Sequence, residues 1–387
     1  MSDKGDSRAG AVLPSWLSAE DVGFYDHVVD IGLSALKPLE KTGAETVNRA
    51  LLERLGAEGL LPRLFPKRLG GALDADVSAV QLCLMREALA RVSTEAETAL
   101  ALQGLGAYPI VQAGNDQLAT SYVPAVAKGR SVAAFAMSEP DAGSDAGAMR
   151  LRAEPERDGW ILSGTKTWIS NAPEADVYAV FARTSDEGSR GITGFVVPGD
   201  AQGLSGQPIE LMSPHPIGRL DFDGVFVPGD HVLGDVGEGF KVAMRTLDLF
   251  RPSVGAFAVG MAQAALDMAI DYAQSRRAFG KSLADFQAVS HNLAEMATRT
   301  QAARLLVYDA ATRFGEGERT SRASAMAKLY ATETAQWVID AAIQIHGAVA
   351  LQRGHPLEHL YREVRATRIY EGTSEIQREV IARDFLR

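Results

Sequence analysis

The spacing of apolar residues changes twice along the chain and divides it into three segments. Up to about residue 130 the apolar positions recur at helical spacing. Ser18, followed by Glu20 and Asp21, predicts a helix start, because a serine cap accepts free backbone amides and early acids suit the helix dipole. Residues 131–234 instead carry short β-rich runs separated by Gly, Pro, Asn and Asp. Helical spacing returns from about residue 235.

The short runs of the middle segment predict a compact antiparallel β domain with a barrel-like shape. Turn residues follow one another closely between the runs, which favours antiparallel pairing. The runs are residues 160–163, 167–170, 177–183, 192–197 and 220–227.

Two long helices are predicted in the C-terminal segment. One apolar stripe has alternating spacings of four and three, as bundle packing requires, and comprises Val289, Leu293, Met296, Thr300, Ala303, Val307, Ala310 and Phe314. A second helix is expected over residues 321–346, with Gly347 as its C-terminal cap. We therefore expect an α+β chain with an N-terminal α-helical domain (1–130), a middle antiparallel β-barrel-like domain (131–234) and a C-terminal four-helix bundle (235–387).

Composition narrows the class of protein. The 387 residues carry 39 basic and 49 acidic side chains, a net charge of −10, which argues against a nucleic-acid binder or a protein of anionic membranes. The single cysteine, Cys83, allows no disulfide within the chain. The first ten residues are polar and of mixed charge, so we expect a cytoplasmic protein. The longest uncharged stretch, 98–115, predicts a buried helix and turn and no membrane insertion.

Common nucleotide and hydrolase motifs are not supported. No G-x-G-x-x-G follows a predicted strand, and no G-x-S-x-G is present. Residues 280–282, Gly-Lys-Ser, have the tail of a phosphate loop, but Ser275 stands where a glycine is needed and we expect the segment to be helical.

One metal motif remains as a distant alternative. His355, Glu358 and His359 match the H-x-x-E-H pattern of zinc peptidases. However, Pro356 favours a helix start, which leaves His355 as a cap outside the regular helical face. We therefore expect no metal site, with a zinc hydrolase as the minor alternative.

Six segments together resemble the acyl-CoA dehydrogenase family of flavoproteins. They read FAMSEPDAGSD at 135–145, GTKTWISN at 164–171, GEGFKVAM followed by LDLFR at 237–251, RRAFGK with FQ at 276–287, QIHG at 344–347 and IYEGTSEIQ at 369–377. Their order and spacing are similar to those of the family.

The resemblance implies FAD-dependent α,β-dehydrogenation of an acyl-CoA thioester to the trans-2-enoyl-CoA. Glu371 would remove the α-proton, and flavin N5 would accept the β-hydrogen as hydride. A general base of this kind works best when its pKa is raised by a desolvated pocket. The resemblance also implies electron transfer to an electron-transferring flavoprotein and a homo-oligomer, usually a tetramer, in which Arg276 reaches the FAD of a neighbouring subunit.

By the same resemblance, further residues are assigned to ligands. The residues expected to bind FAD are Phe135, Met137, Ser138, Gly143, Ser144, Trp168, Ile169, Ser170, Arg276, Phe279, Gln287, Gln344, Ile345, Gly347, Ala348, Thr373 and Glu375. Those expected to bind the substrate are Ser144, Leu247, Phe250, Arg251, Tyr370 and Gly372. Taken without the resemblance, Trp168 could instead fill the core of the β domain.

The chain departs from the family pattern in residues 212–222. The sequence Ser-Pro-His-Pro-Ile-Gly-Arg-Leu-Asp stands there in place of a K-x-G-x-R-x-S-like segment near the acyl-CoA entrance. The same chemistry on a carrier-protein-bound, alicyclic or dicarboxylic acyl thioester is therefore the nearer alternative. Ala348 follows Gly347 where the family often has a second glycine.

Overall fold

The computed structural model describes residues 11–41, 45–213, 215–315 and 321–386. The architecture is an N-terminal helical segment, a middle β segment and a C-terminal helical segment, as the sequence predicted. Close backbone contacts group these segments into two compact units. Unit 1 comprises Met1–Val29, Ala79–Thr94 and Arg251–Arg387, and unit 2 comprises Asp30–Ser78 and Glu95–Phe250. The units cut across the predicted segment boundaries, which remain a prediction.

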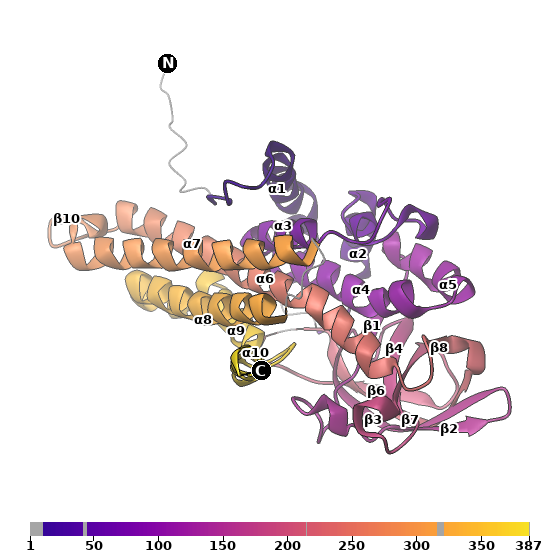
Figure 1. Cartoon of the computed structure of the whole chain (residues 1–387). Helices are drawn as coiled ribbons and strands as arrows, with labels where there is room; N and C mark the ends of the chain where they lie inside the picture. Colours follow the sequence, from indigo (N-terminus) through magenta and orange to yellow (C-terminus); the bar gives the residue numbers. More distant parts are fainter. Residues whose placement is uncertain (1–10, 42–44, 214, 316–320, 387) are drawn as a thin grey trace. The chain divides into compact units, whose positions relative to one another are not determined.

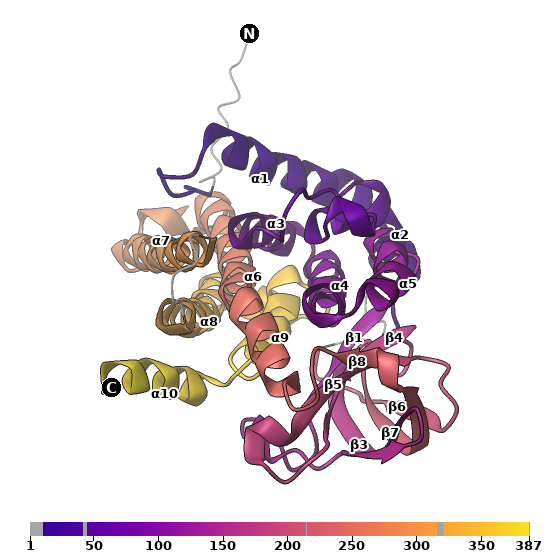
Figure 2. The same cartoon turned by 45° about the vertical axis from the view of Figure 1, so that its right-hand side comes forward.

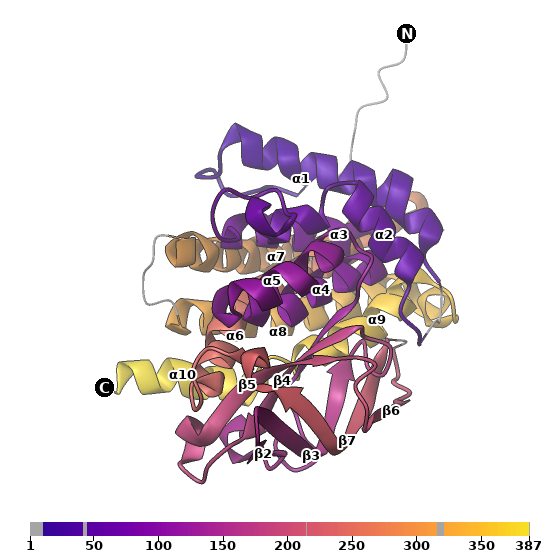
Figure 3. The ribbon, with the colours of Figure 1, turned by 90° about the vertical axis from the view of Figure 1, so that its right-hand side faces the viewer.

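Unit 2 is built on one eight-stranded sheet. Its strands are β1 (Ala133–Ala136), β2 (Arg152–Glu156), β3 (Gly159–Ser170), β4 (Val177–Arg183), β5 (Ile192–Pro198), β6 (Leu204–Pro208), β7 (Ile217–Pro228) and β8 (Val232–Leu233). They are ordered β6-β7-β3-β2-β4-β5-β8, with β1 beside β4. Pairing is antiparallel except that β4 pairs in parallel with β1 and, at one residue, with β2. Figure 3 shows the strands β3, β7 and β6 side by side.

One detail of the strand prediction is wrong. The runs 160–163 and 167–170 form a single long strand, β3. The polar residues between them do not make a turn, because irregularities of register at Gly164 and between Lys166 and Ile169 absorb them within the β3–β7 ladder.

In the described part of unit 2 the sheet is accompanied by α2 (Arg49–Ala57), α4 (Thr94–Ala113, in this unit from Glu95), α5 (Asp116–Ala127) and the beginning of α6 (Gly239–Ser275, in this unit to Phe250). Asn48 and Asn115 cap α2 and α5, each accepting a backbone amide three residues on. α4 contains most of the uncharged stretch and is largely buried, as expected. Short helical turns occupy Gly32–Leu36, Lys37–Leu39, Leu61–Leu64, Lys67–Leu69, Ala146–Ala148, Gly188–Gly191 and Gly229–His231.

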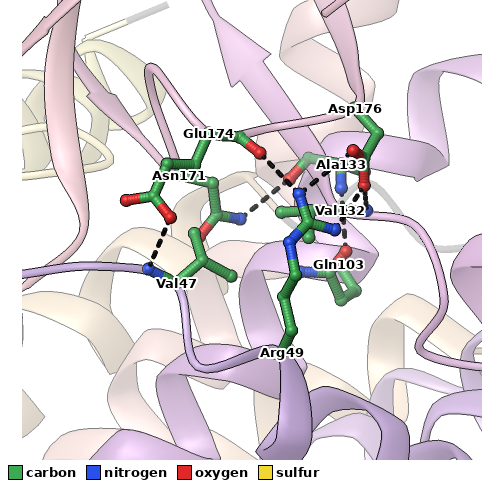
Figure 4. Close-up of polar contacts among 8 residues, drawn as sticks. All are labelled: Val47, Arg49, Gln103, Val132, Ala133, Asn171, Glu174 and Asp176. Carbon is green, nitrogen blue, oxygen red and sulfur yellow. Dashed lines mark hydrogen bonds and ion pairs between the residues drawn. The ribbon is translucent and has the colours of Figure 1, made fainter.

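A polar network joins α2 and α4 to the sheet (Figure 4). The Arg49 guanidinium donates to both carboxylate oxygens of Asp176, at 2.8 and 3.0 Å, and to the carbonyl of Glu174 at 3.0 Å. The amide of Val132 donates to Asp176 at 2.7 Å. Burial alone would raise the pKa of Asp176, but the hydrogen bonds from Arg49 and Val132 lower it.

In the same network the Gln103 side chain accepts from the amide of Ala133 at 2.9 Å, while Asn171 donates to the Ala133 carbonyl at 2.9 Å. Both backbone groups of Ala133 are therefore paired with side chains. Strand β1 is thereby fixed beside α4, and Figure 2 shows the two together.

Unit 1 is helical. Its helices are α1 (Ala19–Ile31, in this unit to Val29), α3 (Ala79–Val92), α6 (Gly239–Ser275, in this unit from Arg251), α7 (Gln287–Gly315), α8 (Ser321–His346), α9 (Pro356–Thr367) and α10 (Ser374–Phe385). Figure 1 shows α7 and α8 running side by side. Short turns lie at Leu283–Asp285 and Gly347–Leu351.

The predicted helix signals are confirmed in unit 1. Ser18 and Asp21 exchange hydrogen bonds, each side chain accepting the other residue's amide at 3.1 Å. In the stripe of α7, Met296 to Ala310 are buried, while Val289, Leu293 and Phe314 are half-buried. Gly347 follows α8 with φ of +66°, a conformation that favours glycine.

The expectation that the segment 280–282 is helical is wrong. Strands β9 (Arg277–Ala278) and β10 (Lys281–Ser282) form a small hairpin between α6 and α7. Phe279 and Gly280 make its turn, both with positive φ. Figure 1 shows β10 at the far end of α7.

Buried Arg304 joins three helices of unit 1 through an ion pair and a hydrogen bond. Arg304 of α7 donates to Glu87 of α3 and to Gln263 of α6, each at 2.8 Å, and Arg304 and Glu87 are almost fully buried. α3 and α6 also approach closely at Gly260, where a Cβ would lie 2.4 Å from the Glu87 carbonyl oxygen. The sequence pattern did not predict this buried charge.

Among the described residues, α6 alone is long and apolar enough to cross a membrane, but 78% of that stretch is buried inside the protein. Burial of this kind is typical of a core helix. We therefore describe α6 as part of the protein interior.

Asp176→Asn should lower the free energy of unfolding by about 1 kcal/mol, because it removes the charge from the hydrogen bonds with Arg49 and Val132. The loss should shrink as the pH falls from the unfolded-state pKa of aspartate, about 4, through the lower pKa that Asp176 has in the folded protein. Urea unfolding measures it. Glu58→Gln, which breaks the i,i+4 pair with Arg54 on the same helix, is the control and should cost roughly 0.3 kcal/mol. Equal losses in the two variants would contradict a special role for Asp176.

Candidate functional site

In unit 2 the loop after β1 lies against the end of β3. The amide of Thr167 donates to the Ser138 carbonyl at 3.0 Å. The ammonium of Lys166 donates to the Met137 carbonyl at 2.8 Å and to the Glu139 carboxylate at 2.9 Å. The structure therefore brings together two of the segments on which the sequence-based site rests.

The Lys166–Glu139 pair is buried and organises this loop. Glu139 also accepts the amides of Arg150 and Leu151, at 2.6 and 2.9 Å, so both its oxygens are used. Burial lowers the pKa of Lys166 to about 8, although the charge and hydrogen bond of Glu139 oppose that shift. The sequence motifs contained both residues, but nothing in their spacing predicted the pair.

Trp168 sits on the irregularity of β3 and points outward. Its φ is +58° and 55% of its surface is exposed. The alternative that Trp168 fills the β-domain core is therefore wrong. A large exposed aromatic face beside a loop of small residues is suited to stacking against a planar ring.

Ser170 lies two residues further on the same strand, half-buried. Its hydroxyl is 3.1 Å from Nε2 of His215. Burial lowers the pKa of His215 to about 4, so the imidazole is neutral at neutral pH. His215 was named in the sequence only as part of the divergent segment.

The other predicted residues of unit 2 differ in exposure. Gly143 and Ser144 are exposed, and a Cβ on Gly143 would meet nothing within 4 Å. Phe135, Ser138 and Leu247 are half-buried, whereas Met137, Ile169 and Phe250 are buried. The Phe250 ring packs edge-on against Tyr108, with 6.3 Å between centroids.

In unit 1, Glu371 stands in a tight turn between α9 and α10. Glu371 and Gly372 have φ of +50° and +94°, so both are in the left-handed region. A Cβ on Gly372 would lie 2.5 Å from the Gln377 side-chain nitrogen, so glycine is required there. Thr373 then caps α10.

Polar contacts from α8 and α10 hold this turn. The Gly372 carbonyl accepts from the Lys328 ammonium at 2.7 Å and from the Gln377 amide at 2.9 Å. Glu333 accepts from the Ser374 hydroxyl at 2.7 Å and pairs with Arg368 at 2.8 Å. The backbone of the turn is thus fixed on both sides of Glu371.

The Glu371 carboxyl has a shifted pKa. Burial raises its pKa, and the positive charges of Arg86, Lys328 and Arg251 partly oppose the rise. Its Oε2 atom is buried and has no hydrogen-bond partner among the residues that the structure describes. A carboxylate with a raised pKa and an unused oxygen is suited to accept a proton from a bound molecule.

A third group of predicted residues lies at the other end of α8. His346 stacks on Tyr272 of α6, with 4.2 Å between ring centroids, which places the end of α8 beside the end of α6. Ile345 is half-buried in this region. The other predicted residues here are exposed: Arg276, Phe279, Gln287, Gln344, Gly347 and Ala348. Phe279, at the hairpin turn, is 94% exposed.

The zinc motif has another use. His355 caps α9, accepting the Leu357 amide on Nδ1 at 3.2 Å, as the sequence predicted. Nε2 of His359 is 2.7 Å from the Thr94 hydroxyl. Over the described residues, no group of three or more His, Cys, Asp or Glu could hold a metal ion. The zinc-hydrolase alternative thus loses its geometric basis.

Lys328 and Arg86 are the residues that sequence reasoning missed in this region. Lys328 lies among buried positions of α8, between Ala327 and Ala331. A lysine at a core position of a predicted helix was the available signal, because lysine is almost never fully buried without a partner.

Glu139→Ala should lower the free energy of unfolding by about 3 kcal/mol, because it leaves the Lys166 ammonium buried and unpaired. Adding Lys166→Met should recover much of that loss. The exposed Asp141–Arg150 pair provides the control, and Asp141→Asn should change stability by less than about 0.5 kcal/mol. Thermal unfolding measures all three. A double variant no more stable than Glu139→Ala would argue against this electrostatic account.

Models of the three acyl-CoA dehydrogenase domains match the chain consecutively. The N-terminal domain model matches residues 20–130, the middle domain model 134–225 and the C-terminal domain model 237–386. The chain is 40% identical over 341 residues to the probable acyl-CoA dehydrogenase FadE25 of Mycobacterium tuberculosis (strain ATCC 25618 / H37Rv), covering 87% of each chain.

Solved structures agree with the family models. Butyryl-CoA dehydrogenase from Megasphaera elsdenii is 34% identical, with a TM-score of 0.91 over 96% of this chain and 99% of that one. A chain of the electron transferring flavoprotein structure of Acidaminococcus fermentans is 35% identical, with a TM-score of 0.91 over 97% and 100%. A chain of an FAD complex of PigA is 28% identical, with a TM-score of 0.89 over 95% and 98%. The chain therefore belongs to the acyl-CoA dehydrogenase family.

Proposed function

We propose that this oxidoreductase removes two hydrogens from the α and β carbons of an acyl-CoA thioester and forms the trans-2-enoyl-CoA. The observation that carries the proposal is the Glu371 carboxyl, which has a raised pKa and a buried oxygen without a partner among the described residues. It stands in a turn that α8 and α10 hold in place.

Glu371 is the general base in this proposal. The α-proton of a thioester is weakly acidic, so a base must accept it at close range from a fixed position. The left-handed turn fixes the backbone of Glu371, and desolvation makes the carboxylate a stronger base than one in water.

The cofactor is FAD, and the residues of unit 2 fit it. Trp168 offers an exposed ring and Ser170 a hydroxyl, while Gly143 leaves open space above the loop. When bound, FAD supplies the two-electron acceptor for the β-hydrogen. We assign Phe135, Ser138, Ser144, Trp168 and Ser170 to direct contact, with Met137 and Ile169 packing beneath them.

The predicted FAD residues of unit 1 fall into two groups. Thr373 and Glu375 belong to the Glu371 turn, held by Lys328, whereas the Arg276 group surrounds His346. Lys328 and His346 are eighteen positions apart on α8, which is about 27 Å along the helix. We infer that the Arg276 group serves the FAD of a second subunit in a homotetramer. Arginine is the side chain best suited to a pyrophosphate.

The remaining assignments follow from relatives. An electron-transferring flavoprotein is the proposed electron acceptor, supported by the solved structure of that name to which the chain is similar. The proposed substrate residues are Leu247, Phe250, Arg251, Tyr370, Gly372 and Ser144.

The alternative substrate is a thioester on another carrier, or one with an alicyclic or dicarboxylic acyl group, because residues 212–222 depart from the family pattern. A cytoplasmic location stays a prediction.

Glu371→Gln should retain FAD but slow flavin reduction by acyl-CoA about 10²- to 10⁴-fold or more, because the amide cannot accept the α-proton. Anaerobic stopped-flow absorbance measures the rate. Glu379→Gln, an exposed position on α10, is the matched control and should reduce at the wild-type rate. Near-native reduction in Glu371→Gln would mean that another group is the base.

Arg276→Ala should weaken FAD retention and tetramer assembly together, since the proposed phosphate contact joins two subunits. Gel filtration with flavin absorbance follows both properties. Arg277→Ala removes the neighbouring exposed guanidinium, which bonds the Gly280 carbonyl of its own hairpin, and should change neither. If Arg276→Ala behaves like Arg277→Ala, the contact across subunits is refuted.

A further inference from the structure

Lys328 is an unusual side chain for the interior of α8. It is fully buried, and its ammonium donates at 2.7 Å to the Gly372 carbonyl, in the turn that carries Glu371. A buried lysine without charged neighbours would lose its proton or destabilise the fold. Burial, the largest effect, and the positive charge of Arg251 lower the pKa of Lys328 to about 8. The negative charges of Glu371, Glu333 and Glu375 oppose this shift and favour the charged form.

The turn does not need Lys328 simply as a hydrogen-bond donor. The Gly372 carbonyl already accepts from the neutral Gln377 amide at 2.9 Å, and the same amide lies 3.3 Å from the Glu371 carbonyl. Glu333 secures the residues that flank the turn, through Ser374 and Arg368. What Lys328 alone adds to this carbonyl is a positive charge.

We propose that Lys328 is a positioning residue for the Glu371 base: its ammonium holds the Gly372 carbonyl in the turn that carries Glu371 and places a positive charge on that turn. This inference rests on the proposed function, in which Glu371 accepts the α-proton. The contact of Lys328 is with the backbone of the turn, so we assign its effect to Glu371.

Three cations in unit 1 act on Glu371: Arg86 of α3, Arg251 of α6 and Lys328 of α8. Desolvation works against them and raises the pKa of Glu371. The two arginines stay charged at any physiological pH, whereas the lysine can titrate. Removing the Lys328 charge should therefore raise the pKa of Glu371 further. The carboxylate form needed to accept the α-proton is then lost at a higher pH than in the wild type.

The test separates charge from hydrogen bonding. Lys328→Met removes the charge, Gln377→Leu removes the other donor to the same carbonyl, and Lys328→Arg keeps a cation. The pKa of Glu371 is read in the holoenzyme by NMR of ¹³C-labelled glutamate carboxyls, with the Glu371 signal assigned from its loss in Glu371→Gln. The acidic limb of the pH profile of flavin reduction is measured in parallel.

Lys328→Met should raise the pKa of Glu371 by about one unit or more and move the acidic limb upward by the same amount. Gln377→Leu should move neither by more than about 0.3 units, and Lys328→Arg should restore the wild-type values. If Lys328→Met does not fold, Lys328→Gln, which keeps a donor but no charge, replaces it.

An unchanged Glu371 pKa in a folded Lys328→Met or Lys328→Gln protein overturns the inference. So does an equal shift in Gln377→Leu, because the effect would then come from the hydrogen bond. The NMR titration does not depend on catalysis. If Glu371→Gln still reduced flavin normally, the proposed function would fail by kinetics while the titration still decided whether Lys328 controls Glu371.

Discussion

Burying the Glu371 carboxyl, whose Oε2 atom has no hydrogen-bond partner among the described residues, destabilises its charged form. The surrounding helices offset this destabilisation with nearby positive charges and with hydrogen bonds to the turn. Burial raises the pKa of Glu371, while cations on α3, α6 and α8 limit the rise. The turn itself lies in the left-handed region at two successive residues and is fixed by Lys328 and Gln377. Because its backbone is held from α8 and α10, the carboxyl keeps its position although its Oε2 atom has no hydrogen-bond partner among the described residues, as the proposed proton transfer requires.

The same principle appears in unit 2, on a different scaffold. Lys166 and Glu139 are buried together and use their remaining hydrogen-bonding capacity on the backbone of the loop after β1. That loop is thereby fixed beside the exposed ring of Trp168. In both units a buried lysine binds the backbone of a short segment that carries proposed site residues. In unit 2 this is the loop after β1, and in unit 1 it is the turn with Glu371.

Local signals allowed much of the fold to be predicted. The four-three spacing of α7, the glycine after α8, the Ser18 cap and the His355 cap each depend on neighbouring residues alone, and each is confirmed. Features that depend on distant partners could not be predicted. Arg304 meets Glu87 across 217 positions of sequence, and no pattern in α7 indicates which acid it finds. The bulge at Trp168 likewise depends on pairing with the distant strand β7, whereas the hairpin at Phe279 pairs residues only three to five positions apart and was missed although it is local.

The candidate site divides in the same way. Glu371 and the loop motifs were found through resemblance to a family, and the turn geometry and electrostatics support the role assigned to Glu371. Lys328 and His215 carry no motif and became visible only through their contacts with Gly372 and Ser170. A lysine on the buried side of a helix is a signal of such contacts, but its partner cannot be read from sequence.

The most direct test of the account is the anaerobic visible spectrum of the purified protein, recorded before and after addition of a series of acyl-CoA thioesters. The account predicts an oxidised flavin spectrum that bleaches with one class of acyl-CoA and not with the corresponding free acids. A protein that remains colourless after reconstitution with FAD, or a bound flavin that no acyl thioester bleaches, would contradict it.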